Sequence, residues 1–354
     1  MTYTQVDQFD PQVVHKGVLQ EKEGDAVRCL TCSHRCLIHE KKAGVCGTRV
    51  NVDGSVKSLI YGNVSSINNN PIEKKPLFHF APGTMALTVG SWGCNASCPF
   101  CQNFDISKRR PTPELTRYVN PDEFVAMAKK RSRGTSISFS EAATLMLEWN
   151  LEVFGLAREQ GLYNTIVTNG FMTLEALDLM IDAGLDAANV DVKGCEPQVR
   201  EMCGIALQPV LDNVIRMIER GVHVELTTLV VPRLSDNMEC LETLACWILD
   251  NAGSKIPWHL NRYYPAYEYT EPATSLERLI QARELAIKTG LEFVYIGNVG
   301  RRGLEDTVCP NCGTLCYERL RLASRNVATD PNGNCRDCGY DLGILFNQKM
   351  PMPS

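Results

Sequence analysis

The chain has 354 residues, of which 44% are hydrophobic and 22% are charged, and its formal net charge is −5. This is the composition of an ordinary globular protein of about two domains. An acidic balance without a long basic run argues against nucleic acid as the main partner. No charged-then-apolar signal pattern opens the sequence, and no apolar run reaches the length of a membrane span. We therefore expect a cytoplasmic protein without a membrane segment.

Cysteine is the most informative residue type. The chain contains 16 cysteines, and most of them fall in C-x2-C or C-x3-C groups, the spacing of metal ligands. In a chain of this length without an export signal, disulfides are the less expected use of these thiols. The grouping predicts metal sites in a reducing compartment, and an anaerobic one if any iron site is left open.

The first cysteine group follows a polar segment with little pattern. Its spacing is C-x2-C-x3-C-x9-C, which suits one tetrahedral zinc ion or an auxiliary iron–sulfur cluster. Unligated buried thiols are the alternative, and His34 could replace one cysteine as a ligand. The predicted ligands are Cys29, Cys32, Cys36 and Cys46.

Two alternating stretches, 48–52 and 56–61, flank the turn pair Asp53-Gly54 and predict a β-hairpin. Residues 1–83 are therefore interpreted as a small metal-binding β module and a linker. The linker, 71–80, is rich in proline and is expected to be extended. It contains Lys74 and Lys75, for which solvent exposure is favoured over a position facing a substrate.

The central feature is the loop 91–103, which follows a short apolar stretch predicted to be a buried strand, 85–90. It holds Cys94, Cys98 and Cys101 in a C-x3-C-x2-C spacing. Three thiolates can bind three irons of a [4Fe-4S] cube and leave the fourth iron open for another ligand. The loop is therefore the place where we expect chemistry.

Strand and helix patterns alternate from residue 84 to residue 300. This order predicts an α/β domain whose parallel strands are joined by right-handed crossovers, as in a partial (β/α)6-type barrel. The predicted strands are 135–140, 163–168, 187–193, 222–231, 258–263 and 292–297. The predicted helices are 121–129, 143–160, 174–183, 210–220, 238–251 and 275–289.

Ligands of such barrels bind at the carboxyl ends of the strands. Asp191 and Lys193 alternate on one strand, so they are expected on one face, where an ionic pair favours a functional role. For His259 a core position is an equal alternative. The polar residues that close the predicted strands are Glu141, Thr168, Asn169, Asp191, Lys193, Thr227, Thr228, Asn261, Arg262 and Asn298, together with Gly297.

The last segment, 301–354, contains two C-x2-C-G turns separated by 22 residues. Two such turns predict a zinc-ribbon-like module, with a second cluster as the alternative. The predicted ligands are Cys309, Cys312, Cys335 and Cys338, and Cys316 is a surplus thiol.

Four further cysteines lie outside these groups. Cys195, Cys240 and Cys246 are interpreted as core residues. Burial is also the favoured interpretation of Cys203, with a substrate-facing thiol as the alternative.

The loop from Cys94 to Cys101, with an aromatic residue before its third cysteine, resembles the cluster loop of radical S-adenosylmethionine (SAM) enzymes. Nearly the whole chain after about residue 25 is similar to one branch, the AmmeMemoRadiSam-system radical SAM enzyme, a relative of the pyruvate formate-lyase activases. The stretches that carry this resemblance are 29–46, 71–80, 101–103, 167–170, 189–193, 257–260, 295–299 and the final cysteine pairs.

The resemblance implies a [4Fe-4S] cluster on Cys94, Cys98 and Cys101, with SAM on the fourth iron. Reduction of the cluster would then cleave SAM to a 5′-deoxyadenosyl radical, which abstracts hydrogen from an unassigned substrate. By matching position, Glu141 and Lys193 would bind the methionyl end of SAM. The ribose or carboxylate side would be lined by Thr168, Asn169 and Asp191, and the adenine or substrate side by His259 and Arg262.

The implied partners are a ferredoxin or flavodoxin-type electron donor and, in this branch, a Memo-like protein and its companion. Two departures affect the SAM contacts: Ser140-Glu141-Ala142-Ala143 stands where the family has Asn-Glu-Pro-Thr, and Pro232-Arg233 replaces Pro-Gly. The alternatives are a glycyl-radical-enzyme activase and, in another class, a metal–sulfur scaffold or electron carrier without SAM chemistry. A persistent glycyl signal in electron paramagnetic resonance would favour the activase, and the departures around Glu141 favour the scaffold.

Overall fold

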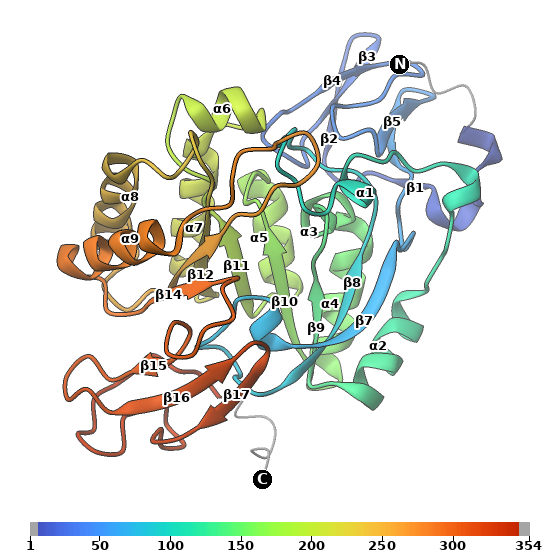
Figure 1. Ribbon diagram of the computed structural model, residues 1–354. Coiled ribbons are helices and arrows are strands. Elements are labelled where there is room, and N and C mark those ends of the chain that lie inside the picture. The colour runs from blue at the N-terminus through green and yellow to red at the C-terminus, as the bar shows by residue number, and fades with distance from the viewer. Residues whose placement is uncertain (1–5, 347–354) are drawn as a thin grey trace.

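The structure is a computed structural model that describes residues 6–346 (Figure 1). An eight-stranded sheet forms the centre of the molecule. Neighbouring strands from β8 to β14 are parallel and follow one another in sequence order, whereas β7 is antiparallel to β8. Within the described residues β7 and β14 are the two edges, so the sheet is open. Its strands are β7 (Ser66–Pro71), β8 (Met85–Gly90), β9 (Gly134–Ile137), β10 (Tyr163–Thr168), β11 (Ala187–Asp191), β12 (His223–Val230), β13 (Trp258–Arg262) and β14 (Val294–Gly297).

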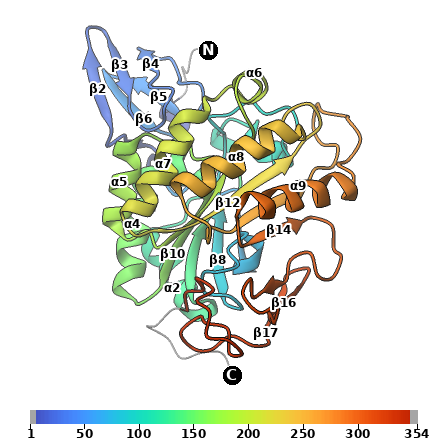
Figure 2. The same ribbon diagram turned by 90° about the vertical axis from the view of Figure 1, so that its left-hand side faces the viewer.

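The long helices cover one side of this sheet, as Figures 1 and 2 show. Each lies between two successive strands in the sequence, and glycines with positive φ, such as Gly184 at the end of α5, let the chain turn back into the next strand. None of the described helices combines the length and the apolar character needed to cross a membrane. The helices are α1 (Phe104–Ser107), α2 (Pro121–Arg131), α3 (Ala142–Leu145), α4 (Leu147–Glu159), α5 (Leu174–Ala183), α6 (Gln198–Cys203), α7 (Leu207–Glu219), α8 (Met238–Asn251) and α9 (Leu276–Thr289).

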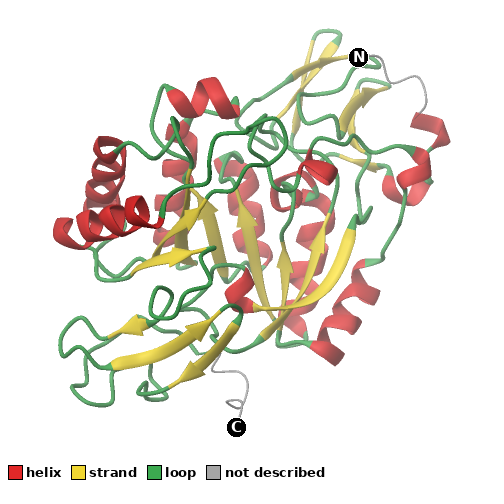
Figure 3. Cartoon of the chain, viewed as in Figure 1, coloured by secondary structure: helices red, strands yellow, loops and turns green. Residues whose placement is uncertain are grey.

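The N-terminal module consists of two small sheets at the carboxyl edge of the central strands (Figure 3). A bridge between Cys32 and Met172, just after β10, attaches it there. The predicted hairpin is confirmed as β5 and β6. The strands are β1 (His15–Lys16), β2 (Gln20–Glu23), β3 (Ala26–Cys29), β4 (Leu37–His39), β5 (Arg49–Val52) and β6 (Ser55–Ser58).

The C-terminal module lies at the opposite end of the central strands, where the parallel strands begin (Figure 1). Tyr340 donates a hydrogen bond to Glu292, just before β14, over 2.7 Å. The module contains β15 (Thr307–Val308), β16 (Leu315–Leu320) and β17 (Ala323–Asn326). The two cysteine-rich modules therefore occupy opposite ends of the central sheet.

The prediction that the linker 71–80 is extended is wrong in its first half, where the chain turns. A single 3-10 turn, Ile72–Lys74, follows β7, and the side chains of Ile72, Leu77 and Phe78 are buried. The N–H of Leu345 donates to the His79 carbonyl over 2.7 Å, so the end of the described chain covers this segment. The segment is thus a buried wall between the central sheet and the C-terminal module.

The prediction for the isolated cysteines is also corrected in part. Cys195 and Cys240 form a disulfide, and Cys246 is exposed, so these three are not free core thiols. Cys203 is fully buried, as the favoured interpretation had it. The sequence could not indicate the disulfide, because it joins the segment after β11 to α8 across 45 residues.

Candidate active site at the carboxyl edge of the sheet

The three-cysteine loop follows β8 directly and is held by backbone hydrogen bonds on both sides. The N–H of Gly93 donates to the Ile106 carbonyl of α1 over 3.0 Å, and the N–H of Ser97 donates to the Cys203 carbonyl of α6 over 2.8 Å. Gly93 has a φ of 79°, and a Cβ there would lie 2.6 Å from Thr48 Cγ2. Glycine is therefore required for the N-terminal module to pack on this loop.

The three thiols have different surroundings. Cys98 is buried, and its hydrogen bond with Cys203 lowers its pKa to about 6, with Lys193 and Lys108 adding to this effect against burial. Cys94 is half-buried and accepts the Ala96 N–H over 3.3 Å. Burial, and then the nearby Glu141, raise the pKa of Cys94.

An all-sulfur donor set around an open cavity fits the corners of an iron–sulfur cube better than a single ion. In the described part of the chain, these three thiols are not among the groups whose ligand atoms all lie within 4.8 Å of one another. Thiolates that bind separate irons of a cube stand further apart than those on one ion. Cys94, Cys98 and Cys101 all line the same cavity, so the side opposite the thiols is available to a further ligand.

The segment after β9 has an unusual backbone that positions Glu141. Phe139 and Ser140 have φ values of 65° and 55°, which non-glycine residues rarely adopt. The Ser140 hydroxyl donates to the Gly93 carbonyl and so ties this segment to the cysteine loop. Positive φ at two consecutive non-glycine residues is a strain typical of functional sites.

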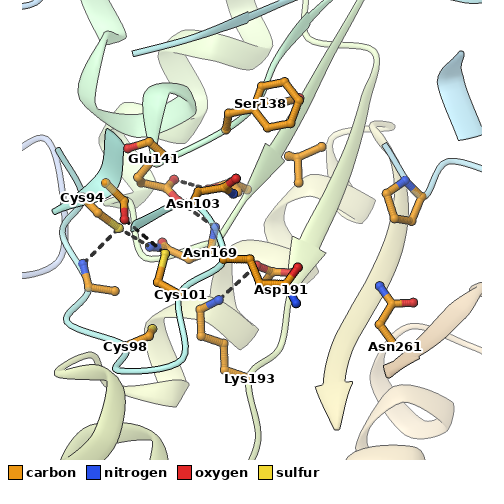
Figure 4. Close-up of a pocket in the computed structure, with 18 of the residues that line it drawn as sticks. Cys94, Cys98, Cys101, Asn103, Ser138, Glu141, Asn169, Asp191, Lys193 and Asn261 are labelled. Carbon is orange, nitrogen blue, oxygen red and sulfur yellow. Dashed lines mark hydrogen bonds and ion pairs between the residues drawn. The ribbon is translucent and has the colours of Figure 1, made fainter. Parts of the chain in front are cut away.

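Figure 4 shows Glu141 beside Asn169 in the wall of the cavity; Glu141 is buried, and three donors fix its carboxylate. Thr168 and Thr144 donate to Oε1 over 2.5 Å and 2.8 Å, and the Asn169 N–H donates to Oε2 over 2.9 Å. Burial raises the pKa of Glu141 despite these hydrogen bonds. The predicted residues Glu141, Thr168 and Asn169 are therefore brought together in one hydrogen-bonded group.

Asn169 connects this group to the cysteine loop. Its Nδ2 donates to Asn95 Oδ1 over 2.7 Å and lies 3.9 Å from Cys94 Sγ. The Asn95 carbonyl in turn contacts His34 of the N-terminal module over 2.7 Å. His34 thus packs against the central loop.

Asp191 and Lys193 form an ion pair of 3.0 Å, which Figure 4 shows beside Cys98 and Cys101. Burial acts to lower the pKa of Lys193, but Asp191 and Cys98 outweigh it and raise that pKa above its usual value. Lys193 therefore remains cationic beside the three cysteines. The expectation that the two residues share a face is confirmed.

The candidate site is a cavity of about 330 Å³ with an adjoining space of about 220 Å³. Cys98, Cys101, Asp191 and Lys193 line both spaces. The predicted strand-end residues that line the larger space are Glu141, Thr168, Asn169, Asp191, Lys193, Asn261 and Asn298, and Thr227 lines the smaller one.

His259 and Arg262 are not brought to this cavity. His259 is buried, and its Nε2 lies 2.7 Å from the Glu225 carboxylate, so it is a core histidine with a partner. Arg262 donates to the Thr274 carbonyl and stacks on the ring of Tyr264. Thr228 is buried and accepts the indole N–H of Trp258.

Two lysines that were not among the predicted site residues line the cavity. Lys108 donates to the Ala96 carbonyl over 3.3 Å behind the cysteine loop. Lys75, for which exposure was favoured, is only 1% exposed and lines the same cavity. The apolar residues on both sides of Lys75 were the signal that could have indicated burial.

The four C-terminal cysteines form a compact group. Sulfur–sulfur distances are 3.6 Å for Cys309–Cys338 and 3.7 Å for Cys312–Cys335, and all four thiols lie within 4.8 Å of one another. Tetrahedral coordination at about 2.3 Å per Zn–S bond requires such spacing. The group can therefore hold one metal ion.

The four N-terminal cysteines are gathered but less compact. They lie close enough for Cys29, Cys36 and Cys46 to raise the pKa of Cys32, although burial is the larger cause. Within residues 6–346, however, they do not satisfy the 4.8 Å limit that the C-terminal group meets. Cys46 lines a cavity of about 360 Å³ together with Cys94, so this group adjoins the central loop.

Comparison with known proteins decides the family. Residues 90–245 match the family model described as the Radical SAM superfamily. A Methanocaldococcus jannaschii protein with the name Uncharacterized protein MJ0808 is 36% identical over 337 residues, which cover 94% of this chain and 100% of that protein. The chain belongs to the family of this archaeal protein, with a radical SAM superfamily domain at 90–245.

Two solved structures that are similar to this chain share little sequence identity with it. A domain of a pyruvate-formate lyase-activating enzyme from Bacteroides vulgatus is 15% identical, covers 44% of this chain and 92% of its own, and has a TM-score of 0.38. Streptococcus suis SuiB bound to S-adenosylmethionine is 13% identical, covers 64% of this chain and 53% of its own, and has a TM-score of 0.47.

Proposed function

We propose that this chain is a radical SAM enzyme that holds a [4Fe-4S] cluster on Cys94, Cys98 and Cys101. The observation that carries the proposal is the convergence of three thiols, one fixed carboxylate and one paired lysine on a single cavity within the radical SAM domain. When bound, the reduced cluster supplies the electron that cleaves SAM to a 5′-deoxyadenosyl radical. The protein's own role is to bind, orient and shield the reactants.

The side chains around the cavity suit the charges of SAM. Glu141 has a fixed, buried carboxylate that can accept a hydrogen bond from the methionyl amine, and Lys193 can attract the methionyl carboxylate. Asp191 keeps Lys193 charged and oriented. Thr168 and Asn169 act through Glu141, because both donate to its carboxylate.

The terminal cysteine groups are proposed to hold different metals. The compact C-terminal group fits one zinc ion in a zinc-ribbon-like module. The more open N-terminal group fits an auxiliary iron–sulfur cluster, and the buried cation Arg49 lies near Cys29 and Cys46, where it would offset the charge of thiolates. A cluster there, beside the central loop, is a suitable entry point for electrons from a ferredoxin or flavodoxin-type donor.

Within the superfamily, we assign the chain to the AmmeMemoRadiSam-type branch on the motifs at 71–80, 167–170 and 189–193. The substrate is a molecule that fits the two joined cavities beside Lys193. A Memo-like protein and its companion are the proposed partners.

The test is anaerobic reconstitution with iron and sulfide, followed by dithionite and SAM. We expect 5′-deoxyadenosine from the wild-type chain and none from the C94A/C98A/C101A variant. Zinc, iron and sulfide are counted on both proteins; the variant should keep its zinc and the N-terminal cluster. No 5′-deoxyadenosine from wild-type protein with a full central cluster would refute the proposal.

A further inference from the structure

Lys75 is a buried lysine in the wall of the candidate active site. It follows the 3-10 turn Ile72–Lys74 and lies between Ile72 and Leu77, which are both fully buried. Its N–H donates to the Ile72 carbonyl over 2.8 Å, which fixes the backbone. The rigid wall therefore holds the side chain in the cavity that the three cysteines share.

The Lys75 ammonium has no hydrogen-bond partner in the structure described for residues 6–346. Its Nζ lies 4.5 Å from the centroid of the Phe139 ring, on the strained segment that positions Glu141. A cation–π contact of this kind is worth far less than the loss of hydration of a buried ammonium. A buried ammonium without a partner in the wall of a cavity is suited to bind a ligand that accepts its hydrogen bonds.

The two carboxylates of the cavity lining, and Lys108 and Lys193, already have partners. Lys193 pairs with Asp191, and Lys108 donates to the Ala96 carbonyl. The Glu141 carboxylate accepts from neutral donors. No carboxylate of the described cavity lining is thus left for Lys75, and its neighbour Lys74 adds a second positive charge at the same wall.

The pKa of Lys75 is consistent with this arrangement. Burial, and then the charge of Lys74, lower it to about 7. An anion bound at Nζ would raise it again, because an opposite charge at close range favours the charged form. An anionic ligand at Nζ would therefore keep the Lys75 side chain protonated and positively charged.

We propose that Lys75 binds an anionic group, a carboxylate or a phosphate, of the substrate that shares this cavity with SAM, so that the substrate is an acid. This inference rests on the proposed function for the identity of the second occupant. The methionyl carboxylate of SAM is the other possible source of the anion. Lys193, which lies by the cysteines and stays charged, is better placed for it.

The experiment measures the binding of inorganic phosphate and of acetate to reconstituted, SAM-loaded protein by isothermal titration calorimetry. At least one of the two anions should bind, and its affinity should fall at least tenfold in K75Q. K74Q removes the same charge from the exposed neighbour and should weaken the binding less than threefold. K75R keeps the charge and should retain more of the binding than K75Q.

The same samples distinguish the two sources of the anion. A tenfold loss of SAM affinity in K75Q would show that Lys75 holds the SAM carboxylate and would overturn the proposal. It is also overturned if neither anion binds to the wild type, or if both bind equally well to K75Q. Thermal unfolding of K75Q at or above the wild-type temperature would show that the variant is folded, as expected when an unpaired buried ammonium is removed.

Failure of this inference differs from failure of the proposed function. Formation of 5′-deoxyadenosine by the wild-type chain, measured separately, reports on SAM chemistry alone. If the wild type cleaves SAM but the affinity for the anion does not depend on Lys75, only the proposed anion site is refuted. If the anion binds at Lys75 but the wild type does not cleave SAM, the anion site is supported and the proposed radical chemistry is refuted.

Discussion

The buried ion pair between Arg49 of β5 and Glu148 of α4 joins the N-terminal module to the radical SAM domain. The two side chains are 1% and 2% exposed, and two parallel hydrogen bonds of 2.9 Å and 2.8 Å connect them. Glu148 also accepts the Val18 N–H over 3.1 Å. We predict that E148Q, which removes the charge of one partner, severely destabilises the protein.

The magnitude follows from burial. E148Q deprives the Arg49 guanidinium of the buried carboxylate that accepts two of its hydrogen bonds, and removing one partner of a buried pair costs about 3–5 kcal/mol of unfolding free energy. The exposed pair Arg35–Glu175 joins the same module to α5 over 2.7 Å, with both side chains more than 40% exposed. E175Q is therefore a matched control, expected to cost less than about 1 kcal/mol.

The assay is urea denaturation of metal-loaded protein, kept anaerobic and followed by circular dichroism. Midpoints at unchanged slope give the differences in unfolding free energy. A double variant, R49M/E148M, should recover most of the loss, since an apolar pair replaces two buried charges. Equal losses for E148Q and E175Q, or a loss below about 1 kcal/mol for E148Q, would contradict the reasoning.

The stabilising pair also gives a pH dependence. Burial alone would raise the pKa of Glu148, but Arg49 outweighs it and lowers that pKa below its usual value. The contribution is therefore complete above the ordinary glutamate pKa of about 4.3 and is lost as the pH falls through the lower, folded value. The stability gap between wild type and E148Q should close below that pH.

Three further outcomes are expected. C335S should lose one zinc per chain and lower the melting temperature, and equal zinc in both proteins would exclude that site. G134A should cost at least about 1–3 kcal/mol, since its Cβ would lie 2.0 Å from the buried Tyr163 ring, whereas G155A, with open space in α4, should be neutral or stabilising. Burial raises the pKa of Glu305 to about 7, so folding favours its protonated form and stability falls as the pH rises from about 4.5 to 7. E305Q should match the wild type in melting temperature at pH 4.5 and exceed it at pH 8; the same difference at both values would contradict this.

Local patterns predicted the central sheet well. The alternation of β-rich and helical stretches located β9 to β14, and glycines at helix ends marked the crossovers. The rule that ligands meet at the carboxyl ends of parallel strands then brought Glu141, Asp191 and Lys193 to one cavity. These features depend on residues that are close in sequence or on adjacent strands of the sheet. The periodicity of apolar residues in the sequence indicates both.

Features that depend on distant segments were missed. His259 was associated with the site through the family resemblance, but it faces Glu225 in the interior. His223, Glu225 and Thr227 alternate with apolar residues along β12, which was a signal that a buried charge needed partners. Lys75 was assigned to solvent because the segment that covers its wall lies more than 200 residues later in the sequence.

The hydrogen bonds between the C-terminal module and the buried wall at 71–80 have a consequence for the folding of the chain during its synthesis. Arg319 donates to the Phe78 carbonyl over 2.7 Å, and Leu345 forms backbone hydrogen bonds on both sides of Phe80. A ribosome that adds about 5–20 residues per second takes roughly 13–50 s to travel from the wall to Leu345. During that interval the backbone of the wall has no partner on its outer side. The outer side of the wall is therefore completed only after Leu345 has been made.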